Sequence, residues 1–218
     1  VDSKGTGSFY ATPRRIAARI THVVDKAQDR QVEVQGPSAS APAQAIAGFA
    51  KKHGVDVSAL GEADTPKGKV VVAKKPQAGV TLASVLAEIV SESLKKLPIP
   101  KVMRWGAGEA QFVRPVHGLV MLHGTKTVPG TVLGLQSVNW TRGHRFMGAP
   151  KIDIGSADNY EKKLLDEGKV LADFGKRKAE IDRQLQAEAT KQNASLGEYQ
   201  VLLDEVAALV EHPRVYVG

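Results

Sequence analysis

Gly and Pro divide residues 112–154 into short stretches that are rich in β-branched and aromatic side chains. Such stretches predict strands, because Gly and Pro interrupt extended segments and favour the turns between them. The expected strands lie at residues 116–122, 128–133, 141–146 and 151–154. Four short strands in so few residues favour antiparallel pairing, since tight turns can join neighbouring strands.

The residues before this region alternate between strand and helix patterns. Residues 15–24 show the two-residue period of a strand, and residues 32–34 predict a second, shorter one. A short amphipathic helix is expected from Pro42 to His53, with Gly54 as its C-terminal stop. A buried strand at 70–73 then precedes a helix at 82–97, which Thr81 caps and Pro98 ends.

The residues after this region are predominantly helical. Ser156 is expected to cap a helix that stops at Gly168, and a short strand is expected at 170–171. Asp173 is the expected N-cap of a longer polar helix that continues to about Asn193. Residues 195–198 have the spacing of a capping box, which predicts the start of a last helix.

Together these patterns predict an α/β fold of the α+β type. We expect a mixed, largely antiparallel sheet body with packed helices over residues 1–155. A helical segment over residues 156–218 would then lead into the next domain of a longer polypeptide. The chain begins without Met and ends on the strand-like residues 215–218, so we expect it to be cut from a longer polypeptide.

The composition excludes several classes of protein. The absence of cysteine among the 218 residues excludes a disulfide framework and a Cys nucleophile, and the histidines lack metal-binding spacing. No phosphate-binding loop, dinucleotide fingerprint or nucleophile elbow occurs, so we expect no catalytic residue and no metal or cofactor in this chain. No apolar run approaches the roughly 20 residues that cross a bilayer, which predicts a soluble, cytoplasmic protein with no membrane partner.

The positive charge is concentrated in the first part of the chain. Residues 1–155 hold 21 Lys and Arg against 11 Asp and Glu, whereas residues 156–218 hold 9 against 12. A basic body with a mildly acidic helical end is typical of a surface that neutralises phosphates. The charge distribution therefore favours a polyanionic partner.

Basic side chains beside Gly, Pro and an aromatic residue recur in four segments. These are residues 9–15, 100–106, 112–115 and 140–146. Guanidinium groups bind phosphate oxygens in two-pronged fashion, and aromatic rings stack on unpaired RNA bases. The predicted phosphate contacts are Arg14, Arg15, Lys101, Arg104, Arg114, Arg142 and Arg145, with His144 as a hydrogen-bond donor and Trp105 and Trp140 as stacking surfaces. In the alternative interpretation, Trp105, Phe112, Trp140 and Phe146 are core residues, and the arginines cap carbonyls or pair with carboxylates.

The same segments, in this order, resemble the N-terminal region of the β subunit of bacterial glycyl-tRNA synthetase, of the type with separate α and β chains. The resemblance covers nearly the whole chain. It rests on residues 11–15, 36–38, 97–105, 112–116, 141–146, 203–206 and 211–213.

The resemblance implies an enzyme that attaches glycine to its tRNA using ATP, with Mg²⁺, at an active site in the α subunit. The implied partners of this chain are that α subunit and tRNA, within a heterotetramer. This chain would be a non-catalytic part of the ligase that helps to bind and position tRNA. Two other functions remain open at this point, namely a structural module for α/β assembly without RNA contact and a hydrolytic editing module.

Overall fold

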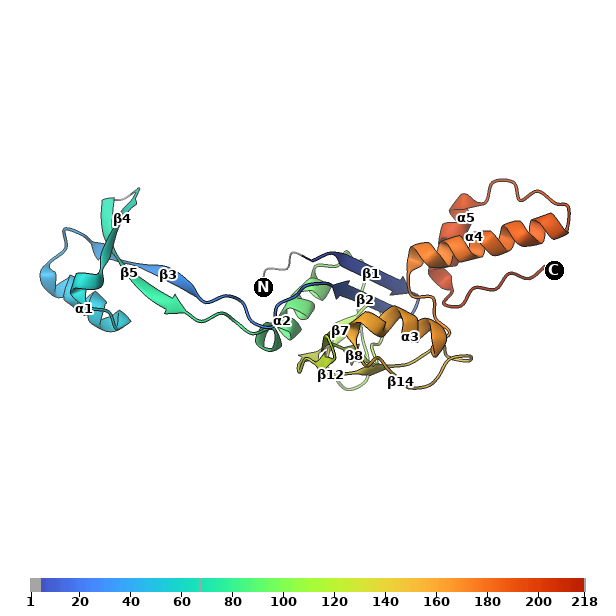
Figure 1. Ribbon diagram of the computed structural model, residues 1–218, viewed down its shortest axis with the longest axis horizontal. Helices are drawn as coiled ribbons and strands as arrows, with labels where there is room; N and C mark the ends of the chain where they lie inside the picture. The colour runs from blue at the N-terminus through green and yellow to red at the C-terminus, as the bar shows by residue number, and fades with distance from the viewer. Residues whose placement is uncertain (1–4, 67, 218) are drawn as a thin grey trace. The chain divides into compact units, whose positions relative to one another are not determined.

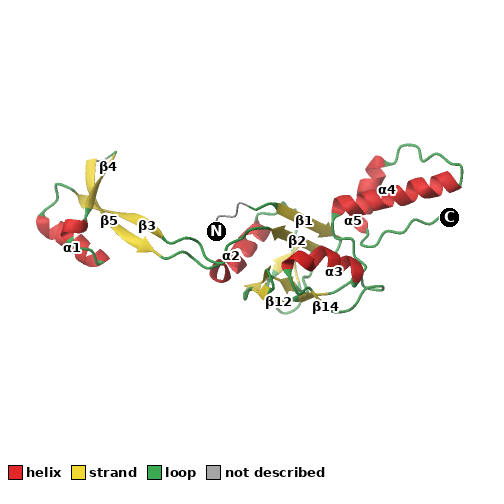
Figure 2. Ribbon diagram, viewed as in Figure 1, coloured by secondary structure: helices red, strands yellow, loops and turns green. Residues whose placement is uncertain are grey.

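The computed structural model describes residues 5–66 and 68–217, which combine helices with short, mostly antiparallel strands as predicted (Figure 2). The α-helices are α1 (Ala43–His53), α2 (Leu82–Lys95), α3 (Tyr160–Asp166), α4 (Phe174–Lys191) and α5 (Gln200–Leu209). Short 3₁₀ turns, Val57–Ala59 and Ala157–Asn159, precede β4 and α3.

The strands of the first half are β1 (Gly7–Thr12), β2 (Arg15–Ile20), β3 (Arg30–Ser38), β4 (Gly61–Thr65), β5 (Gly68–Gln77), β6 (Met103–Arg104) and β7 (Gln111–Phe112). Those that follow are β8 (Leu119–Val120), β9 (Leu122–His123), β10 (Lys126–Thr127), β11 (Thr131–Val132), β12 (Leu135–Val138), β13 (Trp140–Thr141) and β14 (Ile152–Asp153). Among the described residues, all paired strands are antiparallel except β8 and β12, which are parallel.

The chain forms two compact units. The smaller comprises residues 26–81, and the larger comprises the residues before and after it. The predicted boundary near residue 155 lies inside the larger unit, and a division at that point stays a prediction.

The smaller unit is a three-stranded sheet in the order β3-β5-β4, with α1 packed against it (Figure 1). Val71, Val72 and Ala73 of the central strand are buried, as the sequence predicted for this strand. Gly36 is needed beneath the helix, because a Cβ there would lie 2.7 Å from the Phe49 ring. Gly54 ends α1 in the left-handed conformation, with φ of 66°, which confirms the predicted helix stop.

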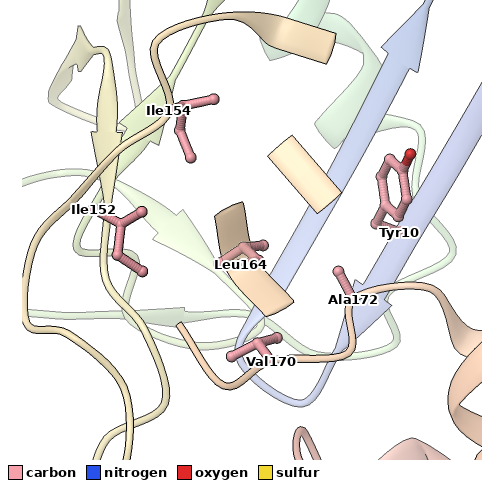
Figure 3. Packing of buried hydrophobic residues seen from close by; sticks show 6 residues of the cluster. All are labelled: Tyr10, Ile152, Ile154, Leu164, Val170 and Ala172. Atoms are coloured by element: carbon pink, nitrogen blue, oxygen red, sulfur yellow. The ribbon is translucent and has the colours of Figure 1, made fainter. Parts of the chain in front are cut away.

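The core of the larger unit lies between the β1–β2 hairpin, β14 and α3 (Figure 3). It consists of Tyr10, Ile152, Ile154, Leu164, Val170 and Ala172. A second cluster forms where α2 packs against the strands that follow it, and it contains Leu82, Met121, Val128 and Val132. A third cluster joins α4 to α5 through Ile181, Leu203 and Ala207. These clusters show why residues distant in sequence belong to one unit.

The β1–β2 hairpin has two different faces. Alternate side chains, including Tyr10 and Arg15, point to the body of the larger unit. The opposite face carries Phe9, Ile16 and Ile20, which are 75%, 60% and 52% exposed. Gly7, Ala11 and Ala18 complete that face, so it bears no charge. We call these six residues the outer hairpin face.

Several predicted elements were wrong in detail, and the strand predicted at 116–122 is two short strands, β8 and β9. The capping box at 195–198 does not begin a helix, because Gly197 turns the chain with φ of 60° and α5 starts only at Gln200. Val170 and Leu171 form no strand; the Leu171 N–H instead donates to the carbonyl of Glu211. The predicted strand at 141–146 stops at Thr141, because residues 142–149 close a loop on themselves.

Candidate RNA interface

Residues 142–149 form a loop that backbone hydrogen bonds hold at both ends. The Gly143 N–H donates to the Ala149 carbonyl at 2.9 Å, and the Gly148 N–H donates to the His144 carbonyl at 3.0 Å. The loop is also tied to the turn that follows α3, since the His144 N–H donates to the Gly168 carbonyl at 2.6 Å. We call residues 142–149 the arginine loop. These backbone hydrogen bonds define the conformation of the loop.

Two glycines allow the arginine loop to lie this close to its neighbours. A Cβ at Gly148 would be 2.2 Å from the Gly168 carbonyl oxygen, and one at Gly143 would be 2.8 Å from the same oxygen. Neither position has room for a side chain. The Gly-x-x-x-x-Gly spacing of these two residues is therefore a steric requirement of the loop.

The loop presents cationic and aromatic side chains to solvent. Arg142 and Arg145 are exposed, and Phe146 is 83% exposed. The Arg145 guanidinium lies 5.6 Å from the centre of the Phe146 ring, within the range of a cation–π contact. Phe146 is therefore not a core residue, and the loop combines the two kinds of group that bind unpaired RNA.

His144 braces the tip of the loop. Its Nδ1 accepts a hydrogen bond from the Phe146 N–H at 3.3 Å. A neutral imidazole that accepts at Nδ1 carries its hydrogen on Nε2. His144 thus keeps a donor nitrogen, as the predicted role requires.

Trp140 is flanked by two cations. The Arg142 guanidinium lies 5.9 Å and the Lys151 ammonium 5.2 Å from the centre of its ring. The ring is only partly exposed. Base stacking on Trp140 would therefore compete with two cations, whereas Phe146 has one cation near its ring and is 83% exposed.

Arg14 and Arg15 are neighbours in the sequence but differ in exposure and in their partners. Arg14 is exposed at the turn between β1 and β2, and no acidic group pairs with it among the residues that the structure describes. The side chain of Arg15 is 15% exposed, and its Nε donates to the Glu211 carboxylate at 3.3 Å. Its Nη2 donates to the carbonyl oxygens of Arg142 and Gly143, at 3.3 and 3.5 Å. Arg15 therefore faces the arginine loop and Glu211.

The other predicted residues lie around the β6–β7 hairpin. Pairing of Arg104 with Gln111 brings the two strands together, and Arg104 donates to Glu109 at 3.2 Å while its side chain stays 58% exposed. Lys101 and Arg114, which flank the hairpin, are exposed, and Trp105 is partly buried. Within residues 5–66 and 68–217, no hydrogen bond joins this group to the arginine loop.

Sequence reasoning missed the residue that links the hairpin to the C-terminal helices. Arg177 of α4 is fully buried, and its guanidinium donates to the carbonyls of Ala11 and Ala207, each at 2.8 Å, and of Leu171 at 2.6 Å. It lies between two lysines in a polar helix. That local pattern predicts an exposed side chain, so no signal in the sequence distinguished it.

The described part of the chain holds no cluster of three or more His, Cys, Asp or Glu side chains that could bind a metal ion. None of its helices is long and apolar enough to span a bilayer.

Residues 3–218 match the model of a family described as "Glycyl-tRNA synthetase beta subunit", which is a subunit of an aminoacyl-tRNA synthetase. The glycine–tRNA ligase β subunit of Aromatoleum aromaticum is 47% identical over 96% of this chain. The chain belongs to the glycyl-tRNA synthetase β-subunit family.

Further relatives carry the same name. The glycine–tRNA ligase β subunits of Neisseria meningitidis serogroup C and Cronobacter sakazakii are 42% and 41% identical over 99% and 97% of this chain. The chain spans 32% of the length of these relatives and of the one from Aromatoleum aromaticum.

Proposed function

We propose that this part of the β subunit binds tRNA through the arginine loop. Arg142 and Arg145 contact phosphates, Phe146 stacks on an unpaired base, and exposed Arg14 extends the surface. Lys101, Arg104 and Arg114 form a second, separate basic group. The whole ligase would use ATP and Mg²⁺ in the α subunit, and this chain would position tRNA without a catalytic residue of its own.

The observation that carries the proposal is a hydrogen-bonded loop that exposes Arg142, Arg145 and Phe146. The hydrogen bonds of Gly143, His144 and Gly148 fix the backbone, so binding orders only the exposed side chains. Arg142 and Arg145 have no carboxylate partner within the described residues, so no ion pair has to break when they meet phosphates. Rigid presentation lowers the entropic cost of binding.

The test is Arg142→Ala combined with Arg145→Ala in the full-length β subunit, assembled with the α subunit. Two charge-assisted hydrogen bonds, each contributing about 1.5 kcal/mol, predict at least a tenfold higher Kd for glycine tRNA. The slope of log Kd against log salt should fall by about one for each phosphate that is no longer neutralised. Glycyl-adenylate formation should be unchanged.

The matched control removes the same charge elsewhere in the larger unit. Arg183→Ala with Lys191→Ala deletes two cations of α4 that pair with Glu180 and Glu188. This variant should bind tRNA nearly as well as the native subunit. Equal affinities for the two double variants would reduce the effect to net charge and contradict the proposal.

A second candidate function is assembly with the α subunit, and the outer hairpin face favours it. A contiguous uncharged face with Phe9, Ile16 and Ile20 exposed is typical of a protein–protein contact. Ile16→Lys with Ile20→Lys should then weaken αβ association measured by analytical ultracentrifugation. Normal association of that variant would exclude this face from the subunit interface.

A further inference from the structure

Arg15 occupies an unusual position for a residue predicted to bind phosphate. Its Nε and Nη2 already donate to Glu211 and to two carbonyls of the arginine loop. Most of its side chain is buried, whereas the adjacent Arg14 is exposed. The hydrogen bonds of Arg15 therefore point toward the protein, and its charge is used to hold residues 142 and 143.

Glu211 is held from several sides. Its side chain is 5% exposed, and the same carboxylate oxygen accepts from Arg15 Nε and, at 2.7 Å, from the Thr12 hydroxyl. Its backbone carbonyl accepts from the Leu171 N–H at 2.8 Å. A buried carboxylate with these donors stays in one orientation, since moving it would leave a charge without partners.

Arg177 fixes the elements that carry this pair. It joins the Ala11 carbonyl of β1 to the Ala207 carbonyl of α5, and Glu211 follows shortly after α5. The end of the hairpin and the segment after α5 are thereby held at a set separation. The Arg15 side chain spans from there to the arginine loop.

We propose that Arg15 and Glu211 are positioning residues that hold the arginine loop in its tRNA-binding conformation. This inference rests on the proposed function of that loop. Neither side chain contacts RNA; both act through the backbone of Arg142 and Gly143. Three segments that are far apart in sequence, the β1–β2 turn, the arginine loop and the residues after α5, operate as one unit.

For Glu211→Gln, the expected change in tRNA affinity is opposite to the change that the loss of a negative charge alone would cause. Removing a negative charge near an RNA surface ordinarily tightens binding. Loss of the Arg15 ion pair should instead loosen the loop, so we expect a Kd for glycine tRNA about fivefold higher in the full-length αβ enzyme. The matched control is Glu205→Gln on the exposed surface of α5, which should leave the Kd unchanged or slightly lower.

Two further variants address charge and folding. Arg15→Lys keeps the charge but replaces the separate donors Nε and Nη2 with a single nitrogen, so it should weaken binding with an unchanged salt slope. Thr12→Val removes the hydroxyl that donates to Glu211 and accepts from the Arg14 N–H, and it should fold even if Glu211→Gln does not. It should change the Kd in the same direction, by about twofold.

Hydrogen exchange separates this inference from the function on which it rests. In Glu211→Gln, the amides of residues 142–149 should exchange at least tenfold faster, with no tRNA present, while those of α2 stay unchanged. Unchanged exchange in the loop would overturn the positioning role. Faster exchange together with normal tRNA affinity of the Arg142→Ala, Arg145→Ala variant would instead overturn the proposed function.

A last experiment combines Glu211→Gln with the Arg142→Ala, Arg145→Ala variant. A positioning residue acts through the loop, so Glu211→Gln should have almost no further effect on Kd when Arg142 and Arg145 are already Ala. Additive losses, or tighter binding by Glu211→Gln alone, would overturn the proposal.

Discussion

Arg177 holds a full positive charge at a position with no exposed surface. Burial lowers the pKa of its guanidinium, while the nearby Glu211 and Asp173 carboxylates oppose that shift. Backbone carbonyls take up its N–H groups, and its guanidinium lies 5.4 Å from the centre of the Phe174 ring. The charge is thus solvated by the protein in place of water.

Replacing Arg177 by Met should be severely destabilising. The carbonyls of Ala11, Leu171 and Ala207 would lose their donor, and each unsatisfied buried acceptor costs about 1–3 kcal/mol. We expect the free energy of unfolding in urea to fall by at least about 3 kcal/mol. The control on the same helix, Arg183→Ala, removes an exposed i,i+3 pair and should change the free energy of unfolding very little. If both variants lose a similar amount of unfolding free energy, Arg177 does not hold these elements together.

Tyr160 should make the free energy of unfolding fall as the pH rises above 10. It is half-buried beside Tyr10, with ring centres 5.4 Å apart, and burial raises its pKa from 10.0 to about 12. A raised folded-state pKa means that the stabilisation is fully present below pH 10 and is lost as pH rises toward 12. Over this range native protein should lose about 2 kcal/mol more than Tyr160→Phe, measured by urea unfolding.

A control at an exposed tyrosine gives the contrast. Tyr216 is 79% exposed, so Tyr216→Phe should follow the native pH profile between pH 10 and 12. If Tyr160→Phe and native protein lose stability in parallel, Tyr160 is not the group responsible.

At the scale of elements, the arginine loop depends on its glycines. Gly148→Ala would place a methyl group 2.2 Å from the Gly168 carbonyl oxygen, so the loop must move away from α3. We expect a loss of stability of about 1–3 kcal/mol and weaker tRNA binding. Gly118→Ala is the matched control, because a Cβ at Gly118 meets nothing within 4 Å. Native tRNA affinity in Gly148→Ala would show that the loop tolerates displacement.

Elements whose signals are local were predictable from sequence. Asp173 caps α4 as expected, its carboxylate accepting from the Lys176 N–H at 2.8 Å, and Gly54 ends α1. The arginine loop was not predictable, because residues 141–146 were expected to form a strand, whereas hydrogen bonds to distant residues, among them Arg15 and Gly168, hold residues 142–144 in a loop. The same holds within the candidate site: composition selected Arg14 and Arg15 equally, and Glu211, far along the chain, distinguishes them.

At the scale of the whole molecule, the chain leaves and re-enters the larger unit at adjacent points. The Leu82 N–H donates to the Asp25 carbonyl at 2.7 Å. The two ends of the smaller unit are also paired, since the Ala27 N–H donates to the Val80 carbonyl at 2.9 Å. The smaller unit is therefore an insertion between neighbouring residues of the larger one.

Replacing residues 26–81 with a short Gly-Ser linker should leave the larger unit folded. None of its three apolar clusters includes a residue of the insertion. Their members lie at or before Val23, or from Leu82 onward. We expect a cooperative thermal transition within a few degrees of the native chain, followed by circular dichroism. Loss of that transition would show that the larger unit needs the insertion to fold.

The ion pair of Arg15 and Glu211 also sets an order of events during synthesis. The two residues are 196 positions apart in sequence, and Arg15 and Arg142 are 127 apart. Contacts of such long sequence separation form late, because the intervening chain must first be ordered. A nascent chain that contains residues 142–149 but not yet Glu211 has the arginines of the loop without the Arg15–Glu211 ion pair. Under the proposed function, the loop would reach its RNA-binding conformation only after residue 211 has emerged.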